Sequence, residues 1–219
     1  TLGLHLHLAT RLCRVVWLRS LYAMIRGFHF IFSAYGFWLP NDPRGSWSDC
    51  IRQYELRAFG PATKTTTRRS VAGKEHDRRQ RTRAKTALKR APVRFTGLQA
   101  REVARGFAEA CGEGGYVCYA LAVLPDHAHL VIGRHSRPVR QLGAHLKAKA
   151  TAALSRANMH PLAQETREGR TPSPWARGYW CMFLDTDERI RQCIEYVDAN
   201  PPKAGLPPQQ WKFVVPPVI

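Results

Sequence analysis

Two histidines separated by a single residue, His127 and His129, stand in the stretch P-D-H-A-H-L-V-I-G. Pro125 and Asp126 favour a turn, and the Leu-Val-Ile run that follows favours a strand, so a strand should begin at His127. Alternate residues of a strand point to the same face, which makes the two imidazoles neighbours on one face and leaves the apolar residues on the other. Imidazole nitrogens that converge in this way can bind one divalent metal ion.

A reacting group must come from elsewhere in the chain, and the segment 187–200 offers a phenol and an amide. The segment predicts an amphipathic helix with a buried stripe at three- and four-residue spacing, formed by Ile190, Cys193, Ile194 and Val197. Asp185 or Thr186 can cap its start, and the proline pair after Asn200 should end it. At about 100° per residue, Tyr196 falls roughly a quarter turn from the centre of the stripe, with Asn200 one turn further on the same side. The phenol and the amide should share one exposed edge.

These motifs resemble those of a known family. An H-x-H after a P-D turn, a helix with Y-x-x-x-N and a following P-x-K-A-G-L resemble the HUH single-strand DNA transposases with one catalytic tyrosine (IS200-like transposase domain), and most of all the REP-associated tyrosine transposases. The likeness extends over about 24–215 and includes F-H-F-I-F-S near its start, W-A-R-G-Y-W at 175–180 and Y-V-D-A-N-P-P-K-A-G-L at 196–206.

The resemblance implies a fold, a reaction and roles for four residues. The fold would be an α+β, ferredoxin-like or RRM-like βαββαβ sheet with a C-terminal helix that carries the tyrosine. The reaction would be cutting and rejoining of single-stranded, hairpin-bearing DNA through a 5′-phosphotyrosine, aided by Mg²⁺ or Mn²⁺. By motif position, His127 and His129 would be metal ligands, Tyr196 the nucleophile and Asn200 the third protein ligand. The sequence departs from the family at two positions, where the small residues Ala128 and Ala199 replace a bulky hydrophobic residue and a frequent second asparagine.

The chemistry of a phosphodiester suits these groups. Because it is anionic and a poor electrophile, a cation must neutralise the charge that develops on its oxygens. Mg²⁺ prefers oxygen ligands whereas Mn²⁺ tolerates imidazole, so two histidines favour Mn²⁺ in vitro. A tyrosine has an unperturbed pKa of about 10 and must lose its proton during attack, to a base that the sequence does not identify. With a single tyrosine in the motif, joining two ends would require a homodimer or sequential turnover.

Composition points independently to a nucleic-acid partner. The chain of 219 residues is 44% apolar, enough for one domain with a real core, and carries a formal net charge of +18 with a pI near 10.4. Such an excess of Lys and Arg favours nucleic acid ahead of an anionic membrane, and no membrane association is expected. The six cysteines contain no C-x-x-C pair, which argues against a disulfide scaffold or a zinc knuckle and fits a reducing cytoplasm. The family resemblance implies a prokaryotic cell, with action at the nucleoid.

The chain is expected to form one transposase domain with additions. Residues 1–23 lack acidic residues and have apolar runs interrupted by arginine, so they are interpreted as translated upstream sequence or an extension, in which His5 and His7 repeat the H-x-H spacing without a turn or a partner segment. The domain should cover 24–215, with a basic insertion at about 50–94 and a tail at 216–219.

The basic insertion concentrates positive charge. Residues 64–94 contain twelve Lys and Arg against two acidic residues, and almost no large apolar residue before Leu88. A helix is expected over about 77–90. Contact with phosphates would give salt-dependent affinity with little sequence preference.

The remaining elements should form the sheet and its covering helices. A central strand is expected over 26–32, a helix over 96–111, a buried central strand over 116–124, a helix over 139–157, a loop over 158–174 and a last strand over 175–184. The first helix should turn Leu98, Val103, Phe107 and Cys111 inward. The second should turn Leu142, Leu146, Ala150 and Leu154 inward and Arg140, Lys147, Lys149 and Arg156 outward. This order places two helices on one face of the sheet and leaves the other face of the histidine strand for the C-terminal helix.

Six residues are candidates for DNA contact. The loop over 37–48 holds two tryptophans and an arginine, which either fold the loop onto the domain or serve as platforms for unpaired bases and a phosphate contact. The candidates are Trp38, Arg44, Trp47, Lys147, Lys149 and Arg177. His29 in the first strand is interpreted as a core or edge histidine, and His145 as a surface histidine.

Two alternatives remain open. A non-catalytic nucleic-acid binder on the same fold, such as a domesticated transposase, would bind DNA without metal and tolerate loss of the Tyr196 hydroxyl. A metal-dependent phosphoesterase that activates water would leave no covalent adduct.

Overall fold

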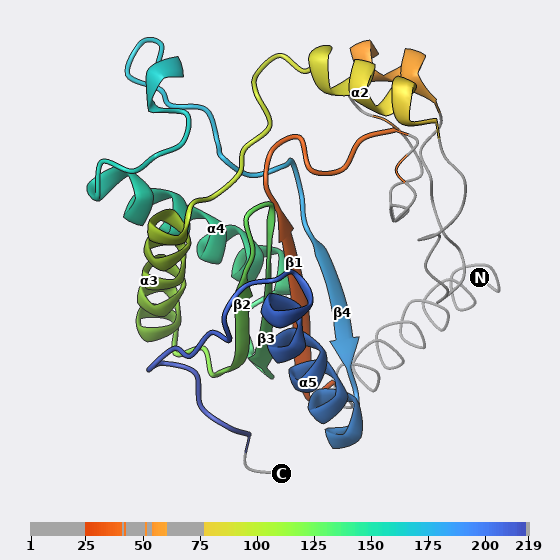
Figure 1. The fold of residues 1–219 in the computed structure, drawn as a ribbon. Helices are drawn as coiled ribbons and strands as arrows, with labels where there is room; N and C mark the ends of the chain where they lie inside the picture. Colours follow the sequence, from red (N-terminus) through yellow and green to blue (C-terminus); the bar gives the residue numbers. More distant parts are fainter. Residues whose placement is uncertain (1–24, 41, 43–50, 52–53, 61–76, 218–219) are drawn as a thin grey trace, which may run out of the picture.

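The computed structural model describes residues 25–40, 42, 51, 54–60 and 77–217 (Figure 1). The predicted extension 1–23, residues 61–76 of the basic insertion, and the DNA candidates Arg44 and Trp47 lie outside these ranges. Within them the elements follow in the order β1 (Gly27–Ser33), η1 (Tyr54–Phe59), α2 (Arg78–Thr86), α3 (Gly97–Gly114), β2 (Cys118–Val123), β3 (His127–Gly133), α4 (Val139–Arg156), η2 (Ala163–Glu165), β4 (Trp180–Leu184) and α5 (Asp187–Lys203). No helix in this described part is long and apolar enough to cross a membrane.

The four strands form one antiparallel sheet in the order β2-β3-β1-β4. The predicted α+β class is confirmed, as are the central position of β1 and the internal position of the histidine strand β3. The strand predicted over 116–124 was expected to be central, and this was wrong, because β2 is an edge strand.

The C-terminal segment explains why the edge strand β2 has the apolar sequence of a buried strand. The side-chain amide of Gln209 both accepts from the backbone of Val123 and donates to it, at 2.8 Å each. Further along, the indole of Trp211 donates to the Leu121 carbonyl at 3.1 Å, and the backbone of Val215 donates to the Cys118 carbonyl at 2.9 Å. Because these groups satisfy the open edge, apolar residues of β2 can be buried without a further strand.

Helices α3 and α4 cover one face of the sheet (Figure 1). The phenylalanines of β1 alternate with residues of the other face and enter this core, where they meet apolar residues of β3 and both helices: Phe28, Phe30, Phe32, Leu130, Ile132, Val103, Phe107, Leu142, Leu146 and Leu154. The inward residues predicted for α4 are confirmed. Leu98, predicted to face inward, is 59% exposed, because it lies in the first turn of α3, ahead of the buried residues of the helix, which begin at Val103.

Helix α5 packs on the opposite face (Figure 1). Its predicted stripe is confirmed, since Ile190, Cys193 and Val197 are buried against β3 residue Val131 and its neighbours. Thr186 caps the helix, with its hydroxyl accepting from the Arg189 backbone at 3.2 Å.

The end of α5 differs from the prediction. The proline pair was expected to stop the helix near Asn200, yet the helix continues through Pro201 and Pro202 to Lys203. Proline fixes φ at a value close to that of a helix, and the last turn is closed by backbone donors that follow the prolines, Ala204 to the Asn200 carbonyl at 3.0 Å and Leu206 to the Pro201 carbonyl at 2.9 Å.

Two other segments refine the predictions. The last strand begins at Trp180 and not at Trp175, because Trp175 turns into the core, where it is 3% exposed and donates from its indole to the Thr151 hydroxyl at 3.1 Å. The helix expected over 77–90 is present as α2, capped by Asp77. It packs on η1 through a small separate cluster formed by Leu39, Leu56 and Ala84.

A close approach of α3 and α4 at Gly106 yields a stability prediction. A Cβ at this position would lie 2.5 Å from the carbonyl oxygen of Lys149 and would also meet the backbone of Ala150. Gly106→Ala should therefore lower the free energy of unfolding by about 2 kcal/mol or more, although alanine favours a helix by about 1 kcal/mol. Gly112→Ala on the same helix is the control, since nothing lies within 4 Å of a Cβ there. Urea unfolding should show Gly112→Ala to be at least as stable as the wild type. Equal stability of Gly106→Ala and Gly112→Ala would contradict the close packing at Gly106.

Candidate active site

The structure brings together the two predicted histidines and the predicted tyrosine. His127 and His129 lie on the face of β3 toward α5, with ring centroids 4.8 Å apart. Tyr196 on α5 places its ring centroid 5.6 Å from that of His129, edge to face. The tyrosine side chain is 48% exposed, so a macromolecular substrate can reach it.

His127 is oriented by two neighbours. Its Nδ1 lies 2.8 Å from the Asp126 carboxylate, and its ring stacks on Phe37 at a centroid distance of 4.8 Å. An ionised carboxylate can only accept a hydrogen bond, so Nδ1 carries the hydrogen and the lone pair resides on Nε2. Histidine ligands of metals commonly have such a carboxylate partner on the other nitrogen.

His129 is only 3% exposed, and its two nitrogens differ in their surroundings. Nδ1 lies 2.9 Å from Nε2 of His29, whereas Nε2 is buried and has no hydrogen-bond partner among the described residues. A buried polar atom without a partner is costly unless a ligand satisfies it. The residues therefore fit a divalent cation bound by the Nε2 atoms of His127 and His129.

His29 is the residue that sequence reasoning missed. It was interpreted as a core or edge histidine, and it is indeed 2% exposed, but its ring stacks on His129 at 5.1 Å and meets Tyr196 at 6.1 Å. Its position in F-H-F-I-F, alternating with the core phenylalanines, places it on the same face as the H-x-H pair once β1 and β3 are neighbours. Combined with the alternation of residues along β1, the expected neighbouring of these two strands could have predicted that His29 faces the H-x-H pair.

Asn200 lies one turn beyond Tyr196, as predicted, and is half-buried. Its amide nitrogen donates to the Tyr196 carbonyl at 2.8 Å. An amide binds a hard cation through its oxygen, so this hydrogen bond is compatible with the predicted role of a ligand, which stays a prediction. Among the described residues no three His, Cys, Asp or Glu side chains are grouped as a metal site, so further ligands would come from the amide, the phenol or the DNA.

Two features set the electrostatics of the site. Burial lowers the pKa of His29 from 6.5 to about 4, and burial together with the neighbouring histidines lowers the pKa of His129 well below its usual value. Both imidazoles are therefore neutral at neutral pH, which keeps lone pairs available. The Lys203 ammonium lies 5.9 Å from the centre of the Tyr196 ring. This lysine belongs to the P-x-K-A-G-L motif and brings a positive charge next to the phenol.

Four predicted DNA contacts fall within the described residues. Trp38 is 37% exposed and packs edge-on against Phe37, the residue that stacks on His127. Arg177 is exposed. Lys149 pairs with Glu113. These three contacts stay predictions.

Lys147, predicted to point outward, is half-buried. Its ammonium donates to the carbonyls of Ala176 and Gly178 at 2.8 and 2.9 Å, and burial lowers its pKa to about 8. The helical pattern marked it as outward because it lies beside the stripe, but the segment before β4 crosses α4 at this point and uses the ammonium to satisfy its backbone. Its main contacts are therefore within the protein.

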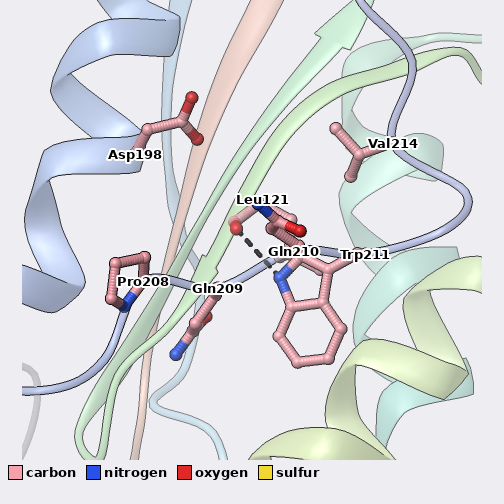
Figure 2. A pocket seen from close by; sticks show the side chains of 7 residues that line it. All are labelled: Leu121, Asp198, Pro208, Gln209, Gln210, Trp211 and Val214. Atoms are coloured by element: carbon pink, nitrogen blue, oxygen red, sulfur yellow. Dashed lines mark hydrogen bonds between the residues drawn. The ribbon is translucent and has the colours of Figure 1, made fainter.

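A shallow cleft of about 390 Å³ lies apart from this cluster, between α5 and the C-terminal segment (Figure 2). It is lined by Leu121, Asp198, Pro208, Gln209, Gln210, Trp211 and Val214. Neither the histidines nor Tyr196 line it, so it is a separate feature of the β2 edge.

Comparison with known proteins gives few matches. No protein-family model and no curated protein matches the chain. Similar solved structures include that of a REP-associated tyrosine transposase bound to a REP hairpin, at 12% identity and a TM-score of 0.44, covering 86% of this chain and 74% of that chain. Another is described as a "putative transposase" from Deinococcus radiodurans R1, at 14% identity and a TM-score of 0.37, covering 78% of this chain and 87% of that chain.

One of these similar structures is thus described as a REP-associated tyrosine transposase, the group that the motifs resemble. At these identities and TM-scores, however, the similarity decides neither the mechanism nor the residues of this chain. Those depend on the site itself.

The lowered pKa of His29 predicts acid lability of the metal-free protein. Between pH 6.5 and about 4 the unfolded chain binds a proton at this residue while the folded protein does not, so stability rises with pH across the window and is lost as the pH falls through it. The resulting loss in the free energy of unfolding between the two ends of this window should approach roughly 3 kcal/mol for His29. Urea unfolding in chelator across this window should show a weaker pH dependence for His29→Phe than for the wild type. Parallel curves would show that His29 titrates normally in the folded state.

Proposed function

We propose that this protein is a metal-assisted DNA strand transferase, a transposase that cleaves and rejoins single-stranded DNA through a phosphotyrosine at Tyr196. The observation that carries the proposal is the convergence of an exposed phenol with two imidazoles: Tyr196 comes from α5, while His127 and His129 come from β3. These elements are separated by about 60 residues in sequence and meet on one face of the sheet.

The proposed reaction exchanges one phosphodiester bond for another and needs no external energy source. The Tyr196 oxygen attacks a phosphorus of the DNA, the bond from phosphorus to the 3′ oxygen breaks, and the proton of the phenol is transferred by way of solvent to the departing 3′ oxygen. The DNA then carries its 5′ phosphate on the tyrosine. Attack by a 3′-hydroxyl on the same phosphorus reverses the exchange and restores the proton to Tyr196, so strands are rejoined without ATP.

The protein's own groups support each part of this reaction. Nε2 of His127 and Nε2 of His129 would hold Mg²⁺ or Mn²⁺, with Asn200 as a further ligand. When bound, the ion would neutralise the charge that develops on the phosphate oxygens. The Lys203 ammonium, 5.9 Å from the centre of the Tyr196 ring, places a positive charge beside the reacting group and the phosphate that it would attack. The exposure of Tyr196 leaves room for a DNA strand across the outer surface of α5.

We also propose that the fold is ferredoxin-like and that the substrate is hairpin-bearing single-stranded DNA. Strand order β2-β3-β1-β4, with α3 and α4 as the two crossing helices, supports a ferredoxin-like assignment. The net charge of +18 supports a nucleic-acid substrate, and the exposed, acid-free helix α2 offers cations for phosphates. Hairpin-bearing DNA is the substrate that the motif resemblance suggests.

A covalent-adduct assay tests the proposal. We mix purified protein with Mn²⁺ and labelled single-stranded hairpin oligonucleotides from its genomic flanks. On a denaturing gel, part of the DNA label should then migrate with the protein, as the band of a covalent adduct. Tyr196→Phe should abolish the band, and His127→Ala should reduce it by about 100-fold or more, because the ion contributes several kcal/mol of charge stabilisation. Tyr54→Phe, which changes a tyrosine of η1 that is 79% exposed, is the control and should form the adduct normally.

Other outcomes separate the alternatives. Binding without adduct or cleavage on any flank would indicate a non-catalytic DNA-binding protein. Cleavage that persists in Tyr196→Phe would indicate a water-activated phosphoesterase.

A further inference from the structure

We propose that His29 is a positioning residue of this site, resting on the metal-assisted function proposed above. It accepts a hydrogen bond from Nδ1–H of His129 and thereby holds the lone pair of His129 on Nε2, the nitrogen assigned to the metal ion. Neither the motifs nor their family resemblance assigns this residue a role.

The contact between the two rings is direct and enclosed. Nε2 of His29 lies 2.9 Å from Nδ1 of His129, within hydrogen-bond distance, and the rings stack with an interplanar angle of 25°. Both residues are buried, at 2% and 3% exposure. One of the two nitrogens must donate and the other accept, because two protonated or two bare nitrogens would repel each other.

Hydrogen-bond counting alone does not choose the donor. If His129 donates, then Nδ1–H of His29 and the lone pair on Nε2 of His129 are left without partners in the described residues. If His29 donates, the same two atoms are left, with the proton and the lone pair exchanged. Each arrangement therefore leaves one buried donor and one buried acceptor.

A cation breaks this equality. A metal ion binds a lone pair, so it is compatible only with the arrangement in which His129 donates from Nδ1 and keeps Nε2 bare. The neighbouring ligand shows the same design, since the Asp126 carboxylate holds the proton of His127 on Nδ1. His29 does for the second ligand what Asp126 does for the first, and both Nε2 atoms become acceptors for one cation.

The identity of residue 29 also fits this role. Its neighbours in β1, Phe28 and Phe30, face the α3–α4 core, while His29 faces α5. An apolar side chain would fill the same space without an unsatisfied nitrogen. Burying a polar atom without a partner costs about 1–3 kcal/mol, a cost that a purely structural residue would avoid.

The tautomer of His129 in the protein saturated with Zn²⁺, a diamagnetic stand-in for Mn²⁺, tests the proposal without reference to activity. Long-range proton–nitrogen correlation spectra of ¹⁵N-histidine-labelled protein at neutral pH report which nitrogen carries the hydrogen; the His129 signals are identified by their loss in His129→Gln. The wild type should show the proton on Nδ1. His29→Gln keeps an acceptor oxygen near the position of Nε2 and should preserve that tautomer, whereas His29→Phe keeps a ring without an acceptor and should give a mixture.

Binding of Mn²⁺ alone, measured by calorimetry, supplies the second readout. His29→Phe should weaken binding by about 10–100-fold, the usual effect of removing the partner of a metal-bound histidine, and His29→Gln should recover most of it. A wild-type His129 protonated on Nε2, or unchanged Mn²⁺ affinity in folded His29→Phe, would overturn the proposal. If His29→Phe fails to fold, the wild-type tautomer decides.

The result is separable from the proposed function. Absence of any DNA adduct, with the expected tautomer and Mn²⁺ binding, would reject the transferase and leave the role of His29 intact. Adduct formation with His129 protonated on Nε2 would support the transferase and reject the role of His29.

Discussion

The register between β1 and β3 determines which side chains meet at the candidate site. Ile31 lies opposite His129 and His29 opposite Val131, so the two histidines become diagonal neighbours on one face. The phenylalanines of β1 fix this register, because all three must enter the core under α3 and α4. A slip of one residue would turn the phenylalanines toward α5 and bury His29 in the apolar core.

The opposite face of the sheet serves two purposes at once. Val131 packs against the apolar stripe of α5, which fixes the position of that helix. His29 lies beside Val131 on β1, and together with His129 and His127 further along β3 it fills the same face with polar rings that are hydrogen-bonded to each other or to Asp126. Tyr196 lies at the margin of this packing, close enough to contact the rings and still half-exposed. The apolar contacts thus position a nucleophile that they do not enclose.

Local pattern was sufficient for much of this arrangement. The alternation in the histidine strand and the stripe of α5 predicted the faces that meet, and they placed His127, His129 and Tyr196 correctly. Failures arose where distant chain segments decide the environment. The C-terminal segment satisfies the edge of β2, which made an edge strand resemble a central one, and two carbonyls before β4 capture Lys147. His29 was recognisable only after strand order was combined with alternation, because nothing in its local sequence distinguishes a ligand-positioning imidazole from a core histidine.

The most direct test of the account is the position of a bound metal ion. Crystals of the protein grown with Mn²⁺ can be measured by anomalous diffraction, which locates the ion without assumptions about its ligands. The account predicts one strong peak bonded to Nε2 of both His127 and His129, on the side of the sheet that carries Tyr196. A peak bound through Nδ1, or occupied Mn²⁺ sites elsewhere with none between these two histidines, would contradict it.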